Sequence, residues 1–280
     1  MIPPVRHIVA VCVLGTALAA CAMSEAPQDP ARPLTSASVS TSGPSTLAPG
    51  PQGLTPLFFK DTGTREKTVA LTFDADMTAD QGTRAKAGEH FDNPDLINTL
   101  RKLKVPATVF MTGRWADQYP KEARAIGQDP LFEVGNHSYS HYSFTGSCFG
   151  LPVLPEKRMR TDVEHAFAAI RKAGVERPMP YFRFPGGCYD NRALRAISPL
   201  GVTAVEWDVV SGDAFATDAD AVMRQVMRGV RPGSVVVMHC TRSAAPVTEQ
   251  AVRSLVPELR RQGYRFVKVS QMIGASGRQR

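Results

Sequence analysis

Two histidines separated by three residues give the first indication of chemistry in this 280-residue chain. His137 and His141 belong to the segment Asn136-His137-Ser138-Tyr139-Ser140-His141, which follows the largely apolar run 131–135. On one helical turn, this spacing points both imidazoles the same way. Neutral imidazoles are good ligands for zinc and similar metals, but a metal site needs at least a third ligand. Because an isolated pair of this kind is more often a hydrogen-bonded polar turn, the rest of the chain has to decide.

The elements that must position these side chains follow a βα pattern. From Thr68 onward, short apolar runs alternate with segments of helical period, which is typical of successive βα units around a parallel sheet. The predicted strands are Val69–Phe73, Ala107–Met111, Phe132–Val134, Tyr181–Phe184, Val202–Trp207, Val235–His239 and Arg265–Val269. The predicted helices include Pro94–Leu103, Glu156–Ala173, Ala219–Arg228 and Val247–Gln262, and Asn93 and Asp218 are suitable N-caps for two of them.

The first predicted strand is not followed by a Gly-x-Gly-x-x-Gly turn, so a flat, doubly wound dinucleotide-binding sheet is disfavoured. No internal repeat is visible either. The sequence therefore predicts an α/β fold, built as a distorted, incomplete (β/α) barrel of about seven parallel strands.

Polar residues stand at the ends of the predicted strands. In chain order they are Asp74 and Asp76, His137 and His141, Arg183, Asp213 and His239. In a parallel barrel all these strand ends open onto one face, where such folds place their chemistry. We therefore expect one site to collect residues that are spread over much of the chain.

Five segments resemble, in the same order, the five motifs of the polysaccharide deacetylase family, also called NodB-homology or carbohydrate esterase family four. They are Thr72-Phe73-Asp74-Ala75-Asp76, His137-Ser138-Tyr139-Ser140-His141, Arg183-Phe184-Pro185-Gly186-Gly187, Trp207 to Asp213, and Val236-Val237-Met238-His239. The resemblance covers roughly residues 68–273. Any one of these segments would be weak evidence, but five in the family's order are strong. The resemblance implies hydrolysis of acetyl groups from sugars with the help of one divalent metal, zinc first, with cobalt, nickel or manganese as alternatives.

The resemblance also implies roles for the metal ligands and the base. His137, His141 and the carboxylate of Asp76 would hold the metal and leave open positions for water and the acetyl oxygen. Asp74 would act as general base, and Arg183 would pair with it and keep it ionised.

The remaining roles concern the developing charge and the leaving group. His239 would be the general acid, oriented by Asp213. A backbone N–H in the turn around Gly186 would stabilise the oxyanion, and Val237 would form a wall of the acetyl pocket. Gly186 stands where many family members carry an aromatic residue.

Two positions depart from the family pattern. The first motif usually has two adjacent aspartates, but here Ala75 is second and Asp76 follows it. We assign Asp74 as base and Asp76 as ligand, and the alternative is that Asp74 does both while Asp76 only supports the site. Ala214 follows Asp213 where the family often has tryptophan, which affects the shape of the acetyl pocket.

The N-terminus resembles a bacterial lipoprotein signal. Arg6 precedes an apolar run, 8–20, that is too short to span a bilayer comfortably, and the run ends Leu-Ala-Ala-Cys at Cys21. Acylation of Cys21 would hold the mature chain to the outer face of a bacterial membrane; if the lipobox is not used, the protein would be secreted. Residues 22–56 are rich in Pro, Ser and Thr and predict a flexible tether, which leaves 57–280 as the catalytic domain.

The charge distribution and the cysteine count limit the partners and the disulfides that the sequence predicts. The net charge is +7, but the basic residues are scattered, so we predict no nucleic-acid binding, and nothing in the sequence predicts a protein partner. Cys148, Cys188 and Cys240 would remain after export, which allows one bridge at most, with the pair undecided and a fully reduced set as the alternative. His90 and His165 are interpreted as solvated or hydrogen-bonded. Trp115 could stack on a sugar or pack under a loop.

Together these features predict an exported, lipid-anchored, metal-dependent enzyme that removes N-acetyl groups from a cell-envelope polysaccharide, with peptidoglycan or a chitin-like glycan as substrate. Two alternatives remain open. One is an esterase that removes O-acetyl groups, and the other is an impaired glycan-binding module that lost turnover through the alanines at 75 and 214.

Overall fold

A computed structural model gives the fold of residues 45–276, and within them nine strands form one sheet in which every strand pair is parallel. The strands are β1 (Leu57–Phe58), β2 (Thr68–Ala75), β3 (Ala107–Met111), β4 (Phe132–Asn136), β5 (Tyr181–Phe182), β6 (Thr203–Val205), β7 (Val209–Val210), β8 (Ser234–His239) and β9 (Arg265–Phe266). Their order is β1-β6-β5-β4-β3-β2-β8-β7, and β9 pairs with the start of β2.

The sheet is an open barrel, because β1 and β7 end the order and are not paired with each other among the described strands. The predicted distorted, incomplete (β/α) barrel is thus confirmed. Each of the seven predicted strands is present, although β5, β6 and β9 are shorter than predicted. The two strands that the sequence did not predict, β1 and β7, have two residues each.

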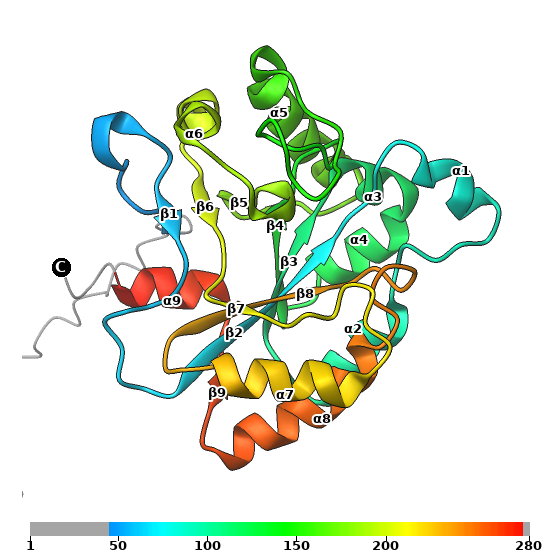
Figure 1. Ribbon diagram of the computed structural model, residues 1–280, viewed down its shortest axis with the longest axis vertical. Coiled ribbons are helices and arrows are strands. Elements are labelled where there is room, and N and C mark those ends of the chain that lie inside the picture. Colours follow the sequence, from blue (N-terminus) through cyan, green and yellow to red (C-terminus); the bar gives the residue numbers. More distant parts are fainter. Residues whose placement is uncertain (1–44, 277–280) are drawn as a thin grey trace, which may run out of the picture. The chain divides into compact units, whose positions relative to one another are not determined.

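The helices lie between and around the strands. The α-helices are α1 (Gln81–Lys86), α2 (Pro94–Lys102), α3 (Gly113–Gln118), α4 (Pro120–Gly127), α5 (Glu156–Lys172), α6 (Asn191–Ile197), α7 (Ala219–Gly229), α8 (Thr248–Arg261) and α9 (Val269–Ser276). The 3-10 turns are η1 (Pro51–Gly53), η2 (Pro185–Gly187) and η3 (Ser198–Leu200). Helix α8 contacts α2 and α7, and α5 contacts α3 and α6, so two groups of helices cover different parts of the sheet (Figure 1).

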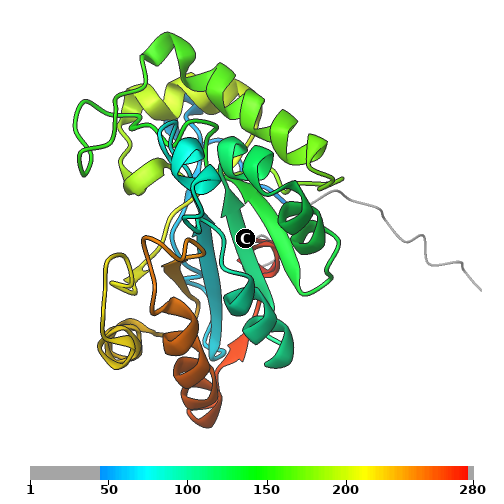
Figure 2. The ribbon, with the colours of Figure 1, turned by 90° about the vertical axis from the view of Figure 1, so that its right-hand side faces the viewer.

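Local sequence explains why the central elements form. All eight residues of β2 are buried, as expected for a parallel strand with both faces covered, and β2, β3 and β4 run side by side between helices (Figure 2). Both predicted N-caps are confirmed. The Asn93 side chain accepts from the N–H of Leu96, and the Asp218 side chain accepts from the N–H groups of residues 220 and 221.

The predicted signal segment, with Cys21, and most of the predicted tether lie outside the described residues. Residues 45–56, which the sequence assigned to the tether, contact the domain: the N–H of Leu47 donates to Thr203, and the hydroxyl of Thr55 donates to the carbonyl of Leu194. The part of the domain in contact with the barrel therefore begins at least ten residues before Leu57. None of the helices described in 45–276 is long and apolar enough to cross a bilayer.

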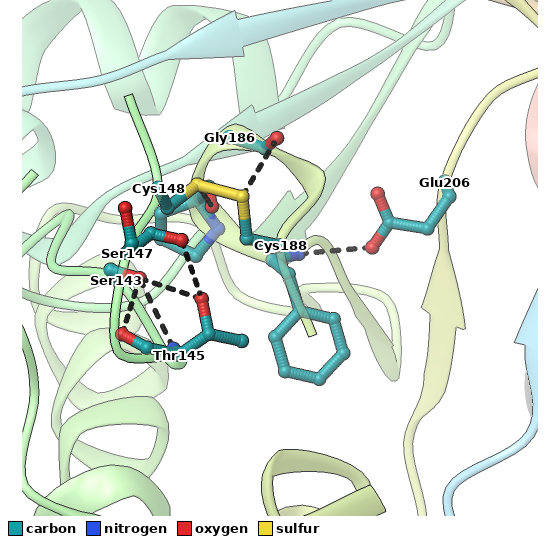
Figure 3. Close-up of a disulfide and its surroundings, with 9 residues drawn as sticks. Ser143, Thr145, Ser147, Cys148, Gly186, Cys188 and Glu206 are labelled. Atoms are coloured by element: carbon teal, nitrogen blue, oxygen red, sulfur yellow. Dashed lines mark hydrogen bonds between the residues drawn. A yellow bond between two sulfur atoms is a disulfide. The ribbon is translucent and has the colours of Figure 1, made fainter. Parts of the chain in front are cut away.

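One disulfide joins two loops at the C-terminal side of the sheet. Cys148 is bonded to Cys188 across 40 residues (Figure 3). Cys240 is a buried free thiol. Cys148 lies in the loop that follows His141, and Cys188 follows η2 directly. The sequence left the pairing open. In the fold, this pair ties the loop after the histidine motif to the turn that contains Gly186.

Replacing both bridged cysteines, as Cys148→Ser with Cys188→Ser, should lower the free energy of unfolding by about 2–4 kcal/mol, because the unfolded chain regains the freedom of a 40-residue loop. Urea unfolding measures the change. Dithiothreitol should bring the wild-type midpoint down to that of the double variant and leave the variant unaffected. Equal midpoints for the oxidised wild type and the variant would contradict the expectation.

Candidate active site

The sheet brings the predicted site residues to one edge. In the register of β2 and β8, Asp74 lies opposite His239, and β3 aligns Met111 with Asn136, the residue before His137. Strands β2, β4 and β8 are parallel and end at these positions. Side chains that are up to 165 residues apart in the chain therefore meet at the C-terminal edge of the sheet.

The histidine motif is a loop and not the helical turn that its spacing suggested. Ser138 and His141 have positive φ angles of 67° and 56°, so the chain bends twice within the motif. The Ser138 hydroxyl accepts from the N–H of His141, and the N–H of His137 donates to the carbonyl of Met111. The two rings nevertheless lie close together, with the ring centroids of His137 and His141 5.0 Å apart and the ring planes tilted by 56°.

The start of α3 holds this loop from outside. The N–H groups of Gly113 and Arg114 donate to the carbonyls of Ser138 and Tyr139. A Cβ atom on Gly113 would lie 2.2 Å from the ring of Tyr139, so only glycine permits this close approach. The loop is therefore fixed by backbone contacts on both sides.

Arg183 and Asp74 form a buried ion pair. The guanidinium Nη1 donates to Asp74 Oδ1 at 2.8 Å, and neither side chain exposes more than 6% of its surface. The other guanidinium nitrogens donate to the backbone carbonyls of Val205 and Glu206, and the carbonyl of Arg183 itself bonds to Nδ1 of His137. Arg183 thus holds both the predicted base and one predicted ligand.

The four candidate metal-binding side chains stand as two pairs. His137 Nε2 lies 3.6 Å from Asp74 Oδ2, and His141 Nε2 lies 3.5 Å from Asp76 Oδ2. Two ligands of one tetrahedral zinc ion, each about 2.1 Å from it, are separated by about 3.4 Å. Because Nδ1 of His137 bonds to a carbonyl, its Nε2 is the nitrogen left for a ligand.

This donor set fits a borderline metal in chemistry, with two imidazoles and at least one carboxylate. As they stand, however, no three His, Cys, Asp or Glu side chains within 45–276 are arranged closely enough to hold one ion. The protonation state of His141 favours metal binding, because burial, opposed by the attraction of Asp76, lowers the pKa of His141 to about 4 and leaves the ring neutral at pH 7.

Thr241 orients Asp76, a contact that the sequence analysis missed. Its hydroxyl donates to Asp76 Oδ1 at 2.6 Å, which leaves Oδ2 facing His141. Thr241 is buried and follows His239 by two residues. No pattern along the chain marks it as a partner of Asp76, because the two residues are 165 positions apart.

His239 and Asp213 form the second charged pair. Nδ1 of His239 lies 2.8 Å from Asp213 Oδ1, and the N–H of His239 donates to Oδ2. The hydroxyls of Ser211 and Thr248 also donate to this buried carboxylate. Burial by itself would lower the pKa of His239. The charge and hydrogen bond of Asp213 outweigh it, together with the charges of Asp76 and Asp74, and raise the pKa to about 9. The ring is therefore protonated at pH 7.

The turn η2 and strand β8 supply the remaining predicted residues. Gly186 has φ 64°, and a Cβ atom there would lie 2.5 Å from the sulfur of Cys148, so the disulfide excludes a larger residue. In this turn the N–H of Gly187 donates to Phe184, and that of Cys188 donates to Pro185. Val237 is buried but belongs to none of the hydrophobic clusters found in the described chain, as expected for a residue on the site side of the sheet.

Glu206 is a buried acid that the sequence analysis also missed. Its Oε1 accepts from the N–H of Phe184 at 3.3 Å, while its Oε2 has no hydrogen-bond partner (Figure 3). Burial raises the pKa of Glu206 to about 8, against the attraction of Arg183. An acidic residue inside the predicted apolar strand 202–207 was the available signal.

Three other residues stand apart from the site. Trp115 is buried and its ring N–H donates to the carbonyl of Phe91, so it packs under the loop. His90 is exposed and pairs with Asp92, and His165 stacks on the ring of Tyr139 at 3.7 Å. The interpretation of His90 and His165 as solvated or bonded side chains agrees with these contacts.

Comparison with known proteins gives a consistent result. The model of the family described as polysaccharide deacetylase matches residues 61–205. A peptidoglycan-N-acetylglucosamine deacetylase of Bacillus cereus is 25% identical over 210 residues, which cover 74% of this chain and 89% of that protein. A chitooligosaccharide deacetylase of Rhizobium leguminosarum bv. phaseoli is 29% identical over 181 residues, which cover 64% of this chain and 71% of that protein.

A solved structure with the same fold belongs to a mutant of a CE4-family pseudoenzyme of Bacillus anthracis whose enzymatic activity has been restored. It superimposes with a TM-score of 0.63 at 25% identity and covers 81% of this chain and 72% of its own.

Asp213→Asn should lower the pKa of His239 from about 9 toward 6.5 in the metal-free protein. Because this pKa is higher in the folded than in the unfolded chain, the proton stabilises the fold below pH 6.5, and the stabilisation is lost as the pH rises through 9. Ring-proton NMR titration and urea unfolding at pH 6 and 10 measure both effects. Asp220→Asn, an exposed acid, is the control, and an unchanged His239 titration in Asp213→Asn would refute the assignment.

Glu206→Gln should have a higher free energy of unfolding than the wild type. The difference between the two free energies, the stability gap, should widen between pH 4.5 and about 8. Across this range the unfolded chain loses the Glu206 proton while the folded chain keeps it, which favours unfolding of the wild type only. Urea midpoints at pH 5 and pH 8 measure the gap, with the exposed Glu156→Gln as control. A gap that stays constant between the two pH values would contradict a buried neutral acid.

Proposed function

The chain belongs to the polysaccharide deacetylase family, and from this premise we propose that it hydrolyses N-acetyl groups from the sugars of a cell-envelope glycan. The observation that carries the proposal is the pairing across β2 and β8. Asp74, held by buried Arg183, lies opposite His239, held by buried Asp213. A fixed carboxylate and a protonated imidazole at neighbouring strand ends are a base and an acid prepared for one reaction.

The donor set beside the base would accommodate a divalent metal, zinc first. A metal held by His137, His141 and Asp76 would supply a more acidic water and an electrophile for the acetyl oxygen. Thr241 supports this assignment of Asp76, because it fixes the carboxylate with Oδ2 toward His141. The alternative, in which Asp74 is both base and ligand, is opposed by the hydrogen bond that already occupies Asp74 Oδ1.

The proton transfers follow from the two pairs. Asp74 would take a proton from the attacking water as the oxygen bonds to the acetyl carbon. Arg183 would hold that carboxylate in place throughout. His239 would then give its proton to the amine nitrogen as the carbon–nitrogen bond breaks, which yields acetate and a free amino sugar. Asp213 would stabilise the charged ring before this transfer.

The turn η2 would bind the negative oxygen of the tetrahedral intermediate. Pro185 has no N–H, and those of Gly187 and Cys188 already bond within the turn, so the N–H of Gly186 is the candidate donor. Val237, two residues before His239 on β8, would line the space for the acetyl methyl group.

The substrate and location are proposed from the relatives and the N-terminus. Relatives named as deacetylases of peptidoglycan N-acetylglucosamine and of chitooligosaccharides favour an N-acetylglucosamine polymer. Acylation at Cys21, followed by a Pro/Ser/Thr-rich tether, would place the enzyme at the outer face of a bacterial membrane, within reach of peptidoglycan. A disulfide between Cys148 and Cys188 is compatible with an oxidising compartment.

A catalytically impaired glycan-binding module is the second candidate, because a pseudoenzyme shares the fold and Ala75 departs from the first motif. The intact pairs at Asp74 and His239 oppose it, since a binding module needs no prepared acid and base. Glycan binding without acetate release under any divalent metal would favour the module. Faster release from O-acetyl than from N-acetyl sugars would favour an esterase.

Asp74→Asn should lower acetate release from N-acetylglucosamine oligomers by about 100- to 10,000-fold while bound metal is retained, because the base is lost and the proposed ligands His137, His141 and Asp76 are unchanged. His137→Ala should lose both bound metal and activity, and His90→Ala is the control that should keep both. Enzymatic acetate determination and elemental analysis of the purified chain measure these effects. Full metal content and full activity in His137→Ala would disprove the metal assignment.

A further inference from the structure

Two phenylalanines close in sequence to the site expose most of their side chains. Phe149 is 88% exposed and Phe215 is 83% exposed, whereas the other exposed large hydrophobic residues in 45–276 reach at most 51%. Single exposed hydrophobic residues are common and need no explanation by themselves. These two differ from the others in their backbone and in their anchoring.

Both residues have left-handed backbone conformations. Their φ angles are 47° and 59°, in the region that bulky L-residues rarely adopt. Such conformations persist where surrounding contacts hold them, and they concentrate at sites that bind ligands. A phenylalanine that is exposed in this conformation adds little to the core, and its ring is open to contact by a ligand.

Phe149 is fixed beside the turn η2. It follows Cys148, whose disulfide to Cys188 ties its loop to that turn. A Cβ atom on Gly186 would lie 3.1 Å from Cδ2 of the Phe149 ring, so the ring lies directly against the glycine that carries the proposed oxyanion donor. The position that is aromatic in many relatives is glycine here, and an aromatic ring from another loop lies next to it.

Phe215 is fixed on the side of the general acid. It follows Asp213 by two residues, and its N–H donates to the carbonyl of Ala244 at 2.6 Å. Ala244 lies in the loop that follows His239. The N–H of His239 in turn donates to Asp213. Phe215 is therefore tied to the segment that carries the acid, while Phe149 is tied to the segment that carries the oxyanion turn.

We propose that Phe149 and Phe215 are sugar-stacking residues that bind pyranose rings of the glycan next to the sugar that loses its acetyl group. The C–H face of a pyranose is apolar, and an exposed aromatic ring, which has only two rotatable side-chain bonds, can cover it at little cost in side-chain entropy. The inference rests on the proposed function for the identity of the glycan. It adds that the enzyme recognises a polymer of several sugars and not one residue.

The first test is the dependence of activity on oligomer length. Phe149→Ala and Phe215→Ala should each lower kcat/KM for the N-acetylglucosamine pentamer about fivefold and that for the dimer much less, because the pentamer offers more sugar rings for stacking than the dimer. Phe149→Trp and Phe215→Trp should restore the pentamer value. Phe59→Ala, a less exposed phenylalanine, is the matched control and should leave both values unchanged. A merely structural role would lower dimer and pentamer values equally, and that result would overturn the proposal.

The second test measures binding without turnover. The fluorescence of the indole introduced by Phe149→Trp should shift when the pentamer is added to the whole chain, whereas Phe59→Trp should respond no more than the wild type. Phe149→Gly should raise the thermal midpoint, because glycine accepts the left-handed conformation, and should still weaken pentamer binding. A stabilised Phe149→Gly with undiminished binding would count against a role for the ring.

The two hypotheses fail in different ways. If the wild type releases no acetate from either oligomer but Phe149→Trp reports pentamer binding that Phe215→Ala weakens, the proposed function fails and the stacking residues stand. If acetate is released with the same length dependence in the wild type and in both alanine variants, the deacetylase stands and the stacking residues fail.

Discussion

The buried ion pair between Arg183 and Asp74 is the constraint on which the site depends. A guanidinium without solvent exposure must satisfy its donors inside the protein, and removing one partner of such a pair costs about 3–5 kcal/mol. Arg183 meets this requirement with one carboxylate and two backbone carbonyls of the segment that contains Glu206. Since its own carbonyl bonds to His137, a single side chain and its peptide group connect β2, β4, β5 and β6.

The general acid, His239, is held by a carboxylate that has several hydrogen-bond donors around it. Asp213 accepts hydrogen bonds from two hydroxyls and from the N–H and ring of His239. Burial raises the pKa of this carboxyl, but the charge of the His239 ring and these hydrogen bonds lower it below its usual value, so the carboxylate stays ionised beside the protonated ring. The base is paired with a cation and the acid with an anion, so two oppositely arranged charge pairs lie at one edge of the sheet.

Two positions that depart from the family pattern are contacted by loops far away in the sequence. Asp76, displaced by one residue from its expected place, accepts a hydrogen bond from Thr241 and faces His141. Gly186 leaves space that the disulfide of Cys148 and the ring of Phe149 occupy. A motif that departs from the family pattern therefore has to be considered together with the loops that contact it in the fold.

By itself, the sequence determined the strands, the long helices and the edge where the site lies, because apolar period, N-caps and polar strand ends depend on nearby residues. It did not determine the pairing of Cys148 with Cys188, the loop conformation of the histidine motif, or the roles of Thr241 and Glu206 near the site. Only the tertiary structure decided these, since each arises from a contact between segments, such as the 165 residues from Asp76 to Thr241, and no local pattern records which distant loop will be the neighbour.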